Sequence, residues 1–211
     1  MTDDKTALDR AYALGGADGA KALYRDWADS YDVGFAALSG YRSPARVAQV
    51  FLDERGEGPV FDAGCGTGLV AAHLPTDMVI DGFDLSAEML DQARATGRYR
   101  TLVEGDLLAP LPCLDGAYRG VLSAGTMTNG HVDHRALAEL VRVLAPGGLA
   151  VISGNVDHLS TPAFAQAFAE LAAQGQISPV RDRVEAIYAN PSHAPPGHGH
   201  DKARILWFRR V

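Results

Sequence analysis

The sequence has few cysteines, a deficit of basic residues and no long apolar run. Its two cysteines, Cys65 and Cys113, offer neither a disulfide framework nor a metal-binding spacing, which favours a reducing, cytoplasmic location. A net charge of −7 without a basic cluster argues against nucleic acid as the main partner. No stretch approaches the ~20 apolar residues that span a bilayer. Residues 1–5 are acidic and lack the apolar region of a signal peptide, so no membrane partner is expected.

The composition is that of a single globular domain covering residues 1–211. Hydrophobic residues make up 47% of the chain and charged residues 21%, and a domain typically holds roughly 100–200 residues. Residues 1–57 have helical character, whereas residues 58–211 alternate short β-type runs with helical patterns. This alternation indicates βαβ units built around a parallel sheet.

Seven β-type runs predict the strands of this sheet. The last two follow the last predicted helix, and we expect them to close the sheet as an antiparallel pair. Ser86 and Asp133 are expected to cap two helices, the second ending at residues 146–148, and a third helix is expected near 161–174. The predicted strands are 60–63, 78–83, 100–103, 118–123, 149–153, 180–188 and 203–211.

A glycine-rich turn follows the first predicted strand and is expected to open a helix. Residues 62–68 read Asp-Ala-Gly-Cys-Gly-Thr-Gly, and glycines allow a backbone to turn sharply and to approach a ligand closely. Nicotinamide-dependent dehydrogenases have the spacing Gly-x-Gly-x-x-Gly, but Leu69 occupies the final place here, which argues against that class. A purely structural strand-to-helix turn remains the alternative.

An acidic residue, Asp84, lies at the end of the second predicted strand. Ligands of doubly wound folds bind beyond the carboxyl ends of the strands, so this carboxylate is placed to accept both ribose hydroxyls of a bound nucleoside. The alternative is an ordinary loop carboxylate near a helix start.

Together these motifs resemble those of class I S-adenosylmethionine-dependent methyltransferases. The resemblance covers about residues 20–155 and rests on segments 62–68, 82–90, 103–107 and 140–148. A narrower similarity links the chain to the methyltransferase-like proteins related to the Williams–Beuren-region methyltransferase. The segments that carry this second similarity are 24–32, 41–44 and 123–132.

The resemblance implies an α/β Rossmann-like three-layer fold with a seven-stranded, mostly parallel sheet, an antiparallel C-terminal strand pair and an N-terminal helical lid over residues 1–57. It implies S-adenosylmethionine as the cofactor. Asp62 would orient the glycine loop and help hold the methionine amino group, Asp84 would bind the ribose, and Asp106 would accept from the adenine amine. The other cofactor-binding residues it implies are Tyr24, Trp27 and Tyr31 of the lid, Gly64, Cys65, Gly66 and Gly68 of the loop, and Leu85, Met89, Gly105, Leu107, Ser123 and Ala124.

Several alternatives stay open at this point. The three lid aromatics also fit an ordinary core stripe at helical spacing. Residues 123–128 lack the Asn/Asp-Pro-Pro-Tyr/Phe motif of adenine, cytosine and glutamine methyltransferases, which favours a small-molecule acceptor. His131, expected in an exposed connection after the fourth strand, is the candidate catalytic residue. A non-catalytic S-adenosylmethionine-binding module is the alternative function. We expect no metal, since the loop histidines His193, His198 and His200 read as solvated, and the oligomeric state is open.

Overall fold

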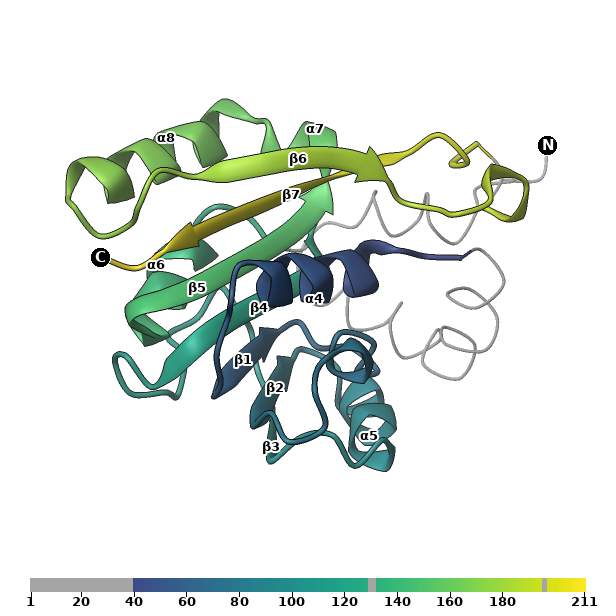
Figure 1. The fold of residues 1–211 in the computed structure, drawn as a ribbon, viewed down its shortest axis with the longest axis horizontal. Coiled ribbons are helices and arrows are strands. Elements are labelled where there is room, and N and C mark those ends of the chain that lie inside the picture. Colours follow the sequence, from purple (N-terminus) through teal and green to yellow (C-terminus); the bar gives the residue numbers. More distant parts are fainter. Residues whose placement is uncertain (1–39, 129–131, 195–196) are drawn as a thin grey trace.

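A seven-stranded sheet runs through the centre of the structure, a computed structural model that describes residues 40–128, 132–194 and 197–211 (Figure 1). The strand order is β3-β2-β1-β4-β5-β7-β6. The first five strands of this order are parallel, and β7 is antiparallel to both of its neighbours, as predicted. The strands are β1 (Val60–Ala63), β2 (Ile80–Asp84), β3 (Thr101–Glu104), β4 (Tyr118–Met127), β5 (Leu144–Asn155), β6 (Arg181–Ala186) and β7 (Lys202–Arg209).

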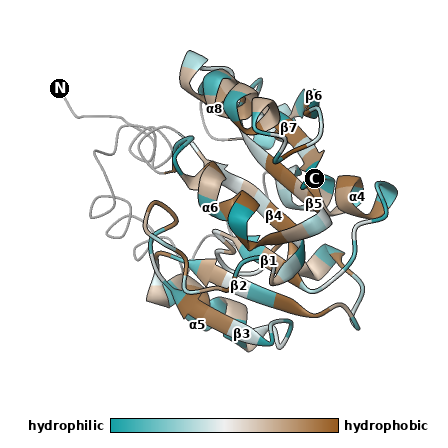
Figure 2. Ribbon diagram, turned by 90° about the vertical axis from the view of Figure 1, so that its left-hand side faces the viewer, coloured by the Kyte–Doolittle hydropathy of each residue, from teal (hydrophilic) through white to brown (hydrophobic). Residues whose placement is uncertain are grey.

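Helices cover both faces of the sheet and give the three layers that the sequence predicted. Figure 2 shows α4 and α6 on opposite sides of β4 and β5. In β1, Val60 joins the apolar cluster under α4, while the next residue, Phe61, joins the cluster under α6 and α8. All four β1 residues are buried because this strand has a core on each face. The helices are α4 (Ser43–Asp53), α5 (Ala87–Ala95), α6 (Ala136–Val143), α7 (Val156–Leu159) and α8 (Pro162–Ala173), with 3-10 helices η2 (Ala71–His73) and η3 (Pro191–His193).

Helix α4 belongs to the core, which corrects part of the lid prediction. Its residues Val47 and Phe51 have no exposed surface and pack with Val60 and Leu122 of the central strands. The segment 1–57, which the sequence predicts to form a lid, therefore contributes helix α4 to one of the layers that cover the sheet. Residues 1–39 lie outside the described residues, so the lid itself stays a prediction.

The expected start of α5 is confirmed and that of α6 is wrong. The Ser86 hydroxyl accepts the Met89 N–H at 3.3 Å and caps α5. By contrast, the Asp133 carboxylate accepts the backbone N–H of Arg135 at 2.9 Å and also pairs with the Arg135 side chain. Asp133 therefore closes the turn before α6, which has no side-chain cap.

The ends of the two neighbouring segments also differ from the prediction. Helix α6 ends at Val143, ahead of residues 146–148, because Leu144 already pairs with Tyr118 at the start of β4. Strand β4 continues past residue 123 to Met127, pairing with Gly154 of β5 after a register shift. Strand β4, which carries the predicted site residues Ser123 and Ala124, is thus longer than the run 118–123 from which it is predicted.

The helix expected directly after the glycine loop is replaced by a shorter element. In the structure, only the 3-10 helix η2 lies between the loop and β2. Leu74 then adopts an extended conformation, with φ −100° and ψ 156°, and Pro75 follows it. A residue before proline disfavours the α conformation, so the chain cannot continue into an α-helix at this point.

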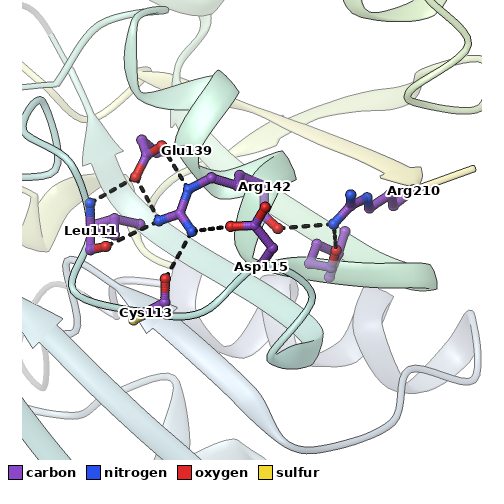
Figure 3. A network of polar contacts seen from close by, with 7 residues as sticks. Leu111, Cys113, Asp115, Glu139, Arg142 and Arg210 are labelled. Carbon is purple, nitrogen blue, oxygen red and sulfur yellow. Dashed lines mark hydrogen bonds and ion pairs between the residues drawn. The ribbon is translucent and has the colours of Figure 1, made fainter.

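A polar network fixes the connection between β3 and β4 on α6 (Figure 3). The Arg142 guanidinium donates to the carbonyls of Leu111 (3.0 Å) and Cys113 (2.8 Å) and pairs with Asp115 and Glu139. Glu139 in turn accepts the Leu111 N–H at 2.7 Å. The hydrogen bond from Arg142 lowers the pKa of the Glu139 carboxyl. This connection begins next to Asp106, so the network also supports one side of the candidate site.

Candidate active site

The glycine loop turns on three residues with positive φ angles, Gly64 (72°), Gly66 (52°) and Gly68 (98°). The N–H of Gly64 donates to the Phe83 carbonyl at 2.8 Å and ties the loop to the end of β2. A Cβ on Gly64 would collide with the Thr126 side chain, whereas a Cβ on Gly66 would meet no described atom within 4 Å. The loop is therefore packed against β4 at its start and open at Gly66.

Asp84 holds this loop through the backbone. One carboxylate oxygen accepts the Gly66 N–H at 2.8 Å, and the other accepts the Ser86 N–H at 3.0 Å. Burial raises the pKa of the Asp84 carboxyl, and these amide hydrogen bonds offset part of the rise because they stabilise the charged form. Asp84, the residue predicted to bind the ribose hydroxyls, is thus held next to Gly66 by backbone hydrogen bonds.

Asp62 lies beneath the loop without any exposed surface. Its Oδ2 accepts a hydrogen bond from the Tyr99 hydroxyl at 2.7 Å, and its Oδ1 has no partner among the described residues. Burial raises the pKa of the Asp62 carboxyl to about 7. Sequence reasoning missed Tyr99, because no motif or spacing links a tyrosine before β3 with the first acidic residue of the loop.

The third strand brings the next predicted residues to the same edge of the sheet. The N–H of Gly105 donates to the Asp84 carbonyl at 2.9 Å, and a Cβ on Gly105 would collide with the Phe83 ring. Asp106 accepts the Leu108 N–H at 2.8 Å. Leu107 is buried in the larger apolar cluster, and Met89 of α5 is buried as well. Leu85 and Asp106 are partly exposed.

The end of β4 contacts the loop from the other side. The Ser123 hydroxyl is buried and donates to the Ala63 carbonyl at 2.8 Å, which joins β4 to the end of β1. Thr126 donates to the Gly64 carbonyl at 3.2 Å. Ala124 is partly exposed beside them. Ser123 therefore has an internal hydrogen-bond partner, and Thr126, which the sequence did not indicate, makes the direct contact with the loop.

Tyr41 reaches the same strand end from outside the sheet. It forms a β-bridge with Tyr188, and the neighbouring Arg42 N–H donates to the Ile187 carbonyl at 2.8 Å. A Cβ on Gly125 would collide with the Tyr41 hydroxyl. The segment before α4 thus borders the end of β4 next to Thr126.

Cys65 has the environment of an unreactive thiol. It is buried, and burial together with the neighbouring Asp62 and Asp84 carboxylates raises the pKa of the thiol well above its usual range. This agrees with its expected role as a small loop residue. Across the described residues, no group of three or more His, Cys, Asp or Glu side chains is arranged to hold a metal ion.

Four predicted site residues lie outside the described residues, namely Tyr24, Trp27, Tyr31 and His131. The chain is described again from Val132, whose carbonyl lies 3.0 Å from Nε2 of the buried His158. His158 of α7 therefore contacts the residue at which the described chain resumes. Of the other predicted cofactor-binding residues, the structure gathers those of the loop, β2, β3 and β4 at one edge of the sheet. Within the described residues, no helix is long and apolar enough to cross a membrane.

Comparison with known proteins gives matches of sequence and of fold. Residues 60–148 match the family described as methyltransferase domain. Methyltransferase-like protein 27 of Homo sapiens is 40% identical over 139 residues, 62% of this chain and 56% of that protein. A demethylmenaquinone methyltransferase of Symbiobacterium thermophilum is 36% identical over 98 residues, 42% of this chain and 39% of that protein. The chain thus spans about half, or less, of these relatives.

One solved structure with the same fold contains S-adenosyl-L-homocysteine. Geranyl diphosphate C-methyltransferase from Streptomyces coelicolor, solved with S-adenosyl-L-homocysteine, superposes with a TM-score of 0.58 at 20% identity, covering 79% of this chain and 76% of that one. The family match, the relatives and the strand order agree with one another. Residues 60–148 match a methyltransferase domain, and the chain is similar to S-adenosylmethionine-dependent methyltransferases in sequence and in fold.

Proposed function

We propose that this chain transfers the methyl group of S-adenosylmethionine to a small-molecule acceptor. The observation that carries the proposal is the glycine loop: Gly66 has a positive φ angle, no described atom lies within 4 Å of its Cβ position, and its N–H donates to the Asp84 carboxylate. The names of two similar proteins, a demethylmenaquinone and a geranyl diphosphate methyltransferase, also refer to small acceptors. A cytoplasmic location, expected from the two free cysteines, is part of the proposal.

The residues at the strand ends fit S-adenosylmethionine in charge and in space. Asp62, with an unpartnered oxygen among the described residues, would oppose the positive charge of the methionine part bound on the loop. A Cβ-free Gly66 leaves room for close approach to the backbone. Asp84 would bind the ribose hydroxyls, and Asp106 with Leu107 would recognise the adenine. The four lid and loop residues outside the described chain, Tyr24, Trp27, Tyr31 and His131, complete the proposed site.

Catalysis would rest mainly on alignment. S-adenosylmethionine, when bound, supplies a methyl group already activated by its sulfonium. The protein must place the acceptor in line and exclude water, which is the contribution of proximity and orientation. His131, which follows β4 in the sequence, would orient the acceptor or take its proton. Tyr41 and Thr126 border the same strand end and would shape the acceptor side.

Two measurements test the proposal. Calorimetry should give a dissociation constant in the micromolar range for S-adenosylhomocysteine, about −8 kcal/mol, and no binding of a nicotinamide dinucleotide. Incubation with methyl-labelled S-adenosylmethionine and a metabolite extract should then transfer label to small molecules. Absence of S-adenosylhomocysteine binding would overturn the proposal. Tight binding without any transfer would favour the alternative of a non-catalytic S-adenosylmethionine-binding module.

A further inference from the structure

Tyr99 occupies the space beneath the glycine loop. It precedes β3, and its ring lies between the loop and β2: a Cβ on Gly68 would lie 3.1 Å from the ring, and a Cβ on Gly82 would lie 3.0 Å from it. The hydroxyl donates to Asp62 Oδ2 at 2.7 Å. The two glycines therefore create the space that brings this phenol to the Asp62 carboxylate.

Within the described part of the chain, Tyr99 is the only hydrogen-bond donor to the Asp62 carboxylate. The described groups that interact with this carboxyl are Tyr99, Asp84 and the Cys65 thiol, and none of these three is positively charged. Burial and the Asp84 charge raise the pKa of Asp62 to about 7, whereas the hydrogen bond from Tyr99 lowers it. Among the described residues, Oδ1 has no partner. A buried carboxylate in such surroundings keeps its charge near neutral pH only with the help of its hydrogen-bond donor.

We propose that Tyr99 is a positioning residue for cofactor binding, whose hydroxyl keeps the Asp62 carboxylate fixed and charged beneath the glycine loop as the counter-charge to the cationic methionine part. The proposal rests on the proposed function, because it requires a cation on the loop. It assigns to Tyr99 a role in ligand affinity that acts through Asp62, without contact between the phenol and the ligand.

A dependence of affinity on pH follows from this arrangement. A cation bound on the loop favours the ionised form of Asp62, so affinity rises with pH as this group loses its proton. Removal of the Tyr99 hydroxyl raises the pKa of Asp62, because it removes a hydrogen bond to the charged form. The pH at which affinity reaches its plateau therefore moves upward in Tyr99→Phe.

The test measures S-adenosylhomocysteine binding by calorimetry between pH 6 and pH 9. For a rise of about one unit in the Asp62 pKa, Tyr99→Phe binds roughly fivefold more weakly than wild type at pH 7 and roughly equally at pH 9. The amino group of the ligand titrates in the same way in every variant. The ratio of dissociation constants between variants therefore isolates the protein group.

The chain offers a matched control in Tyr118→Phe. The Tyr118 hydroxyl also donates to an aspartate, Asp81 Oδ2, at 3.0 Å, but Asp81 is paired with Arg100 and lies away from the loop. This variant loses a similar buried hydrogen bond, and its affinity should follow the wild-type pH profile. Urea unfolding of both variants measures whatever stability each phenol contributes.

A second ligand and a second variant complete the design. 5′-Methylthioadenosine lacks the amino acid part, so its binding should show no pH-dependent difference between wild type and Tyr99→Phe. Asp62→Asn removes the titrating group, and adding Tyr99→Phe to it should cause no further change with pH.

The possible outcomes separate the two proposals. A constant loss of affinity at every pH, or the same loss for 5′-methylthioadenosine, would show a merely structural role for Tyr99 and overturn the inference. If Tyr99→Phe does not fold, a wild-type pH profile that Asp62→Asn leaves unchanged would overturn it as well. If wild type binds no S-adenosylhomocysteine at any pH, the proposed function itself fails, and the role of Tyr99 fails with it.

Discussion

Substitution of single glycines can distinguish an effect on ligand binding from an effect on folding stability. Gly66 has a positive φ angle and no described atom within 4 Å of its Cβ position, and Gly97, at the end of α5, has the same two properties outside the site. Alanine at either position should cost about 1–2 kcal/mol of folding stability, because both adopt the left-handed conformation. Only Gly66→Ala places a methyl group where the cofactor is proposed to bind.

We therefore expect Gly66→Ala to weaken S-adenosylhomocysteine binding at least tenfold, about 1.4 kcal/mol, and Gly97→Ala to leave affinity unchanged. Calorimetry on both variants, with urea unfolding alongside, provides the comparison. Equal affinities in the two variants would place the cofactor elsewhere. Gly64→Ala is no substitute in this test, because its Cβ collides with Thr126 and disturbs the fold.

Asp84 supports a second residue-scale prediction. Its two oxygens already accept the N–H groups of Gly66 and Ser86, so in Asp84→Asn one of these N–H groups faces the amide NH₂. We expect about 2 kcal/mol of lost S-adenosylhomocysteine affinity, roughly thirtyfold, since a charged acceptor is removed. The control is Asp91→Asn, an exposed carboxylate on α5. Unchanged affinity in Asp84→Asn would remove this residue from the ribose site.

At the scale of elements, Arg142 joins α6 to the connection before β4. Replacement by methionine keeps the apolar stem but removes the guanidinium donor to Glu139 and to the carbonyls of Leu111 and Cys113, and leaves Glu139 only the Leu111 N–H. We expect a loss of about 2 kcal/mol in the free energy of unfolding. Arg94→Met breaks an exposed ion pair on α5 and should change stability by less than about 0.5 kcal/mol. Equal urea midpoints in the two variants would show that the Arg142 network of Figure 3 does not stabilise the fold.

The elements that the sequence predicts well are those with strong local signals. β1 matches its expected bounds because it is a short apolar run between a proline and a glycine turn. The α5 cap at Ser86 is equally local. The predictions are wrong where a distant strand partner or a following residue determines the end of an element. Pro75 prevents a helix after the glycine loop, and the pairing of Leu144 with Tyr118 ends α6 early.

The residues of the candidate site also fall into two groups, those that the sequence indicates and those that only tertiary packing brings there. The acidic residues at the ends of β1, β2 and β3 follow from the motif order, because parallel strands end at one edge of the sheet. Tyr99, Thr126 and Tyr41 reach that edge by tertiary packing, and no sequence spacing indicates their approach. Prediction from sequence therefore finds the residues that belong to recognisable motifs and misses the neighbours that pack against them.

For the whole molecule, stability should be greatest on the acidic side of neutrality. The Asp62 pKa rises from 3.8 to about 7 on folding, so its contribution is present below the unfolded value and is lost as pH rises through about 7. The pKa values of Asp81 and Glu139 are lowered, so their contributions are lost as pH falls below their ordinary values of 3.8 and 4.5. The free energy of unfolding should therefore peak near about pH 4 to 5 and fall as pH rises towards 7.

Urea unfolding without ligand between pH 4 and pH 8 tests this expectation. Wild type should lose stability from pH 5.5 to pH 8, and Asp62→Asn should lose less, because it no longer carries the buried titrating group. Asp84, whose pKa is also raised, leaves part of the slope in place. Identical slopes in the two proteins would show that Asp62 is already ionised in the folded protein below this range, so that folding does not raise its pKa.

The position of β7 has a consequence for the order in which the protein folds. β7 follows β6 in sequence but lies between β5 and β6 in the sheet. During synthesis, residues 181–186 emerge with no strand to pair with, and the outer edge of β5 stays open until 202–209 follow. The nascent chain therefore exposes two unpaired strand edges until residues 202–209 emerge, and completion of the sheet awaits the contact made by β7.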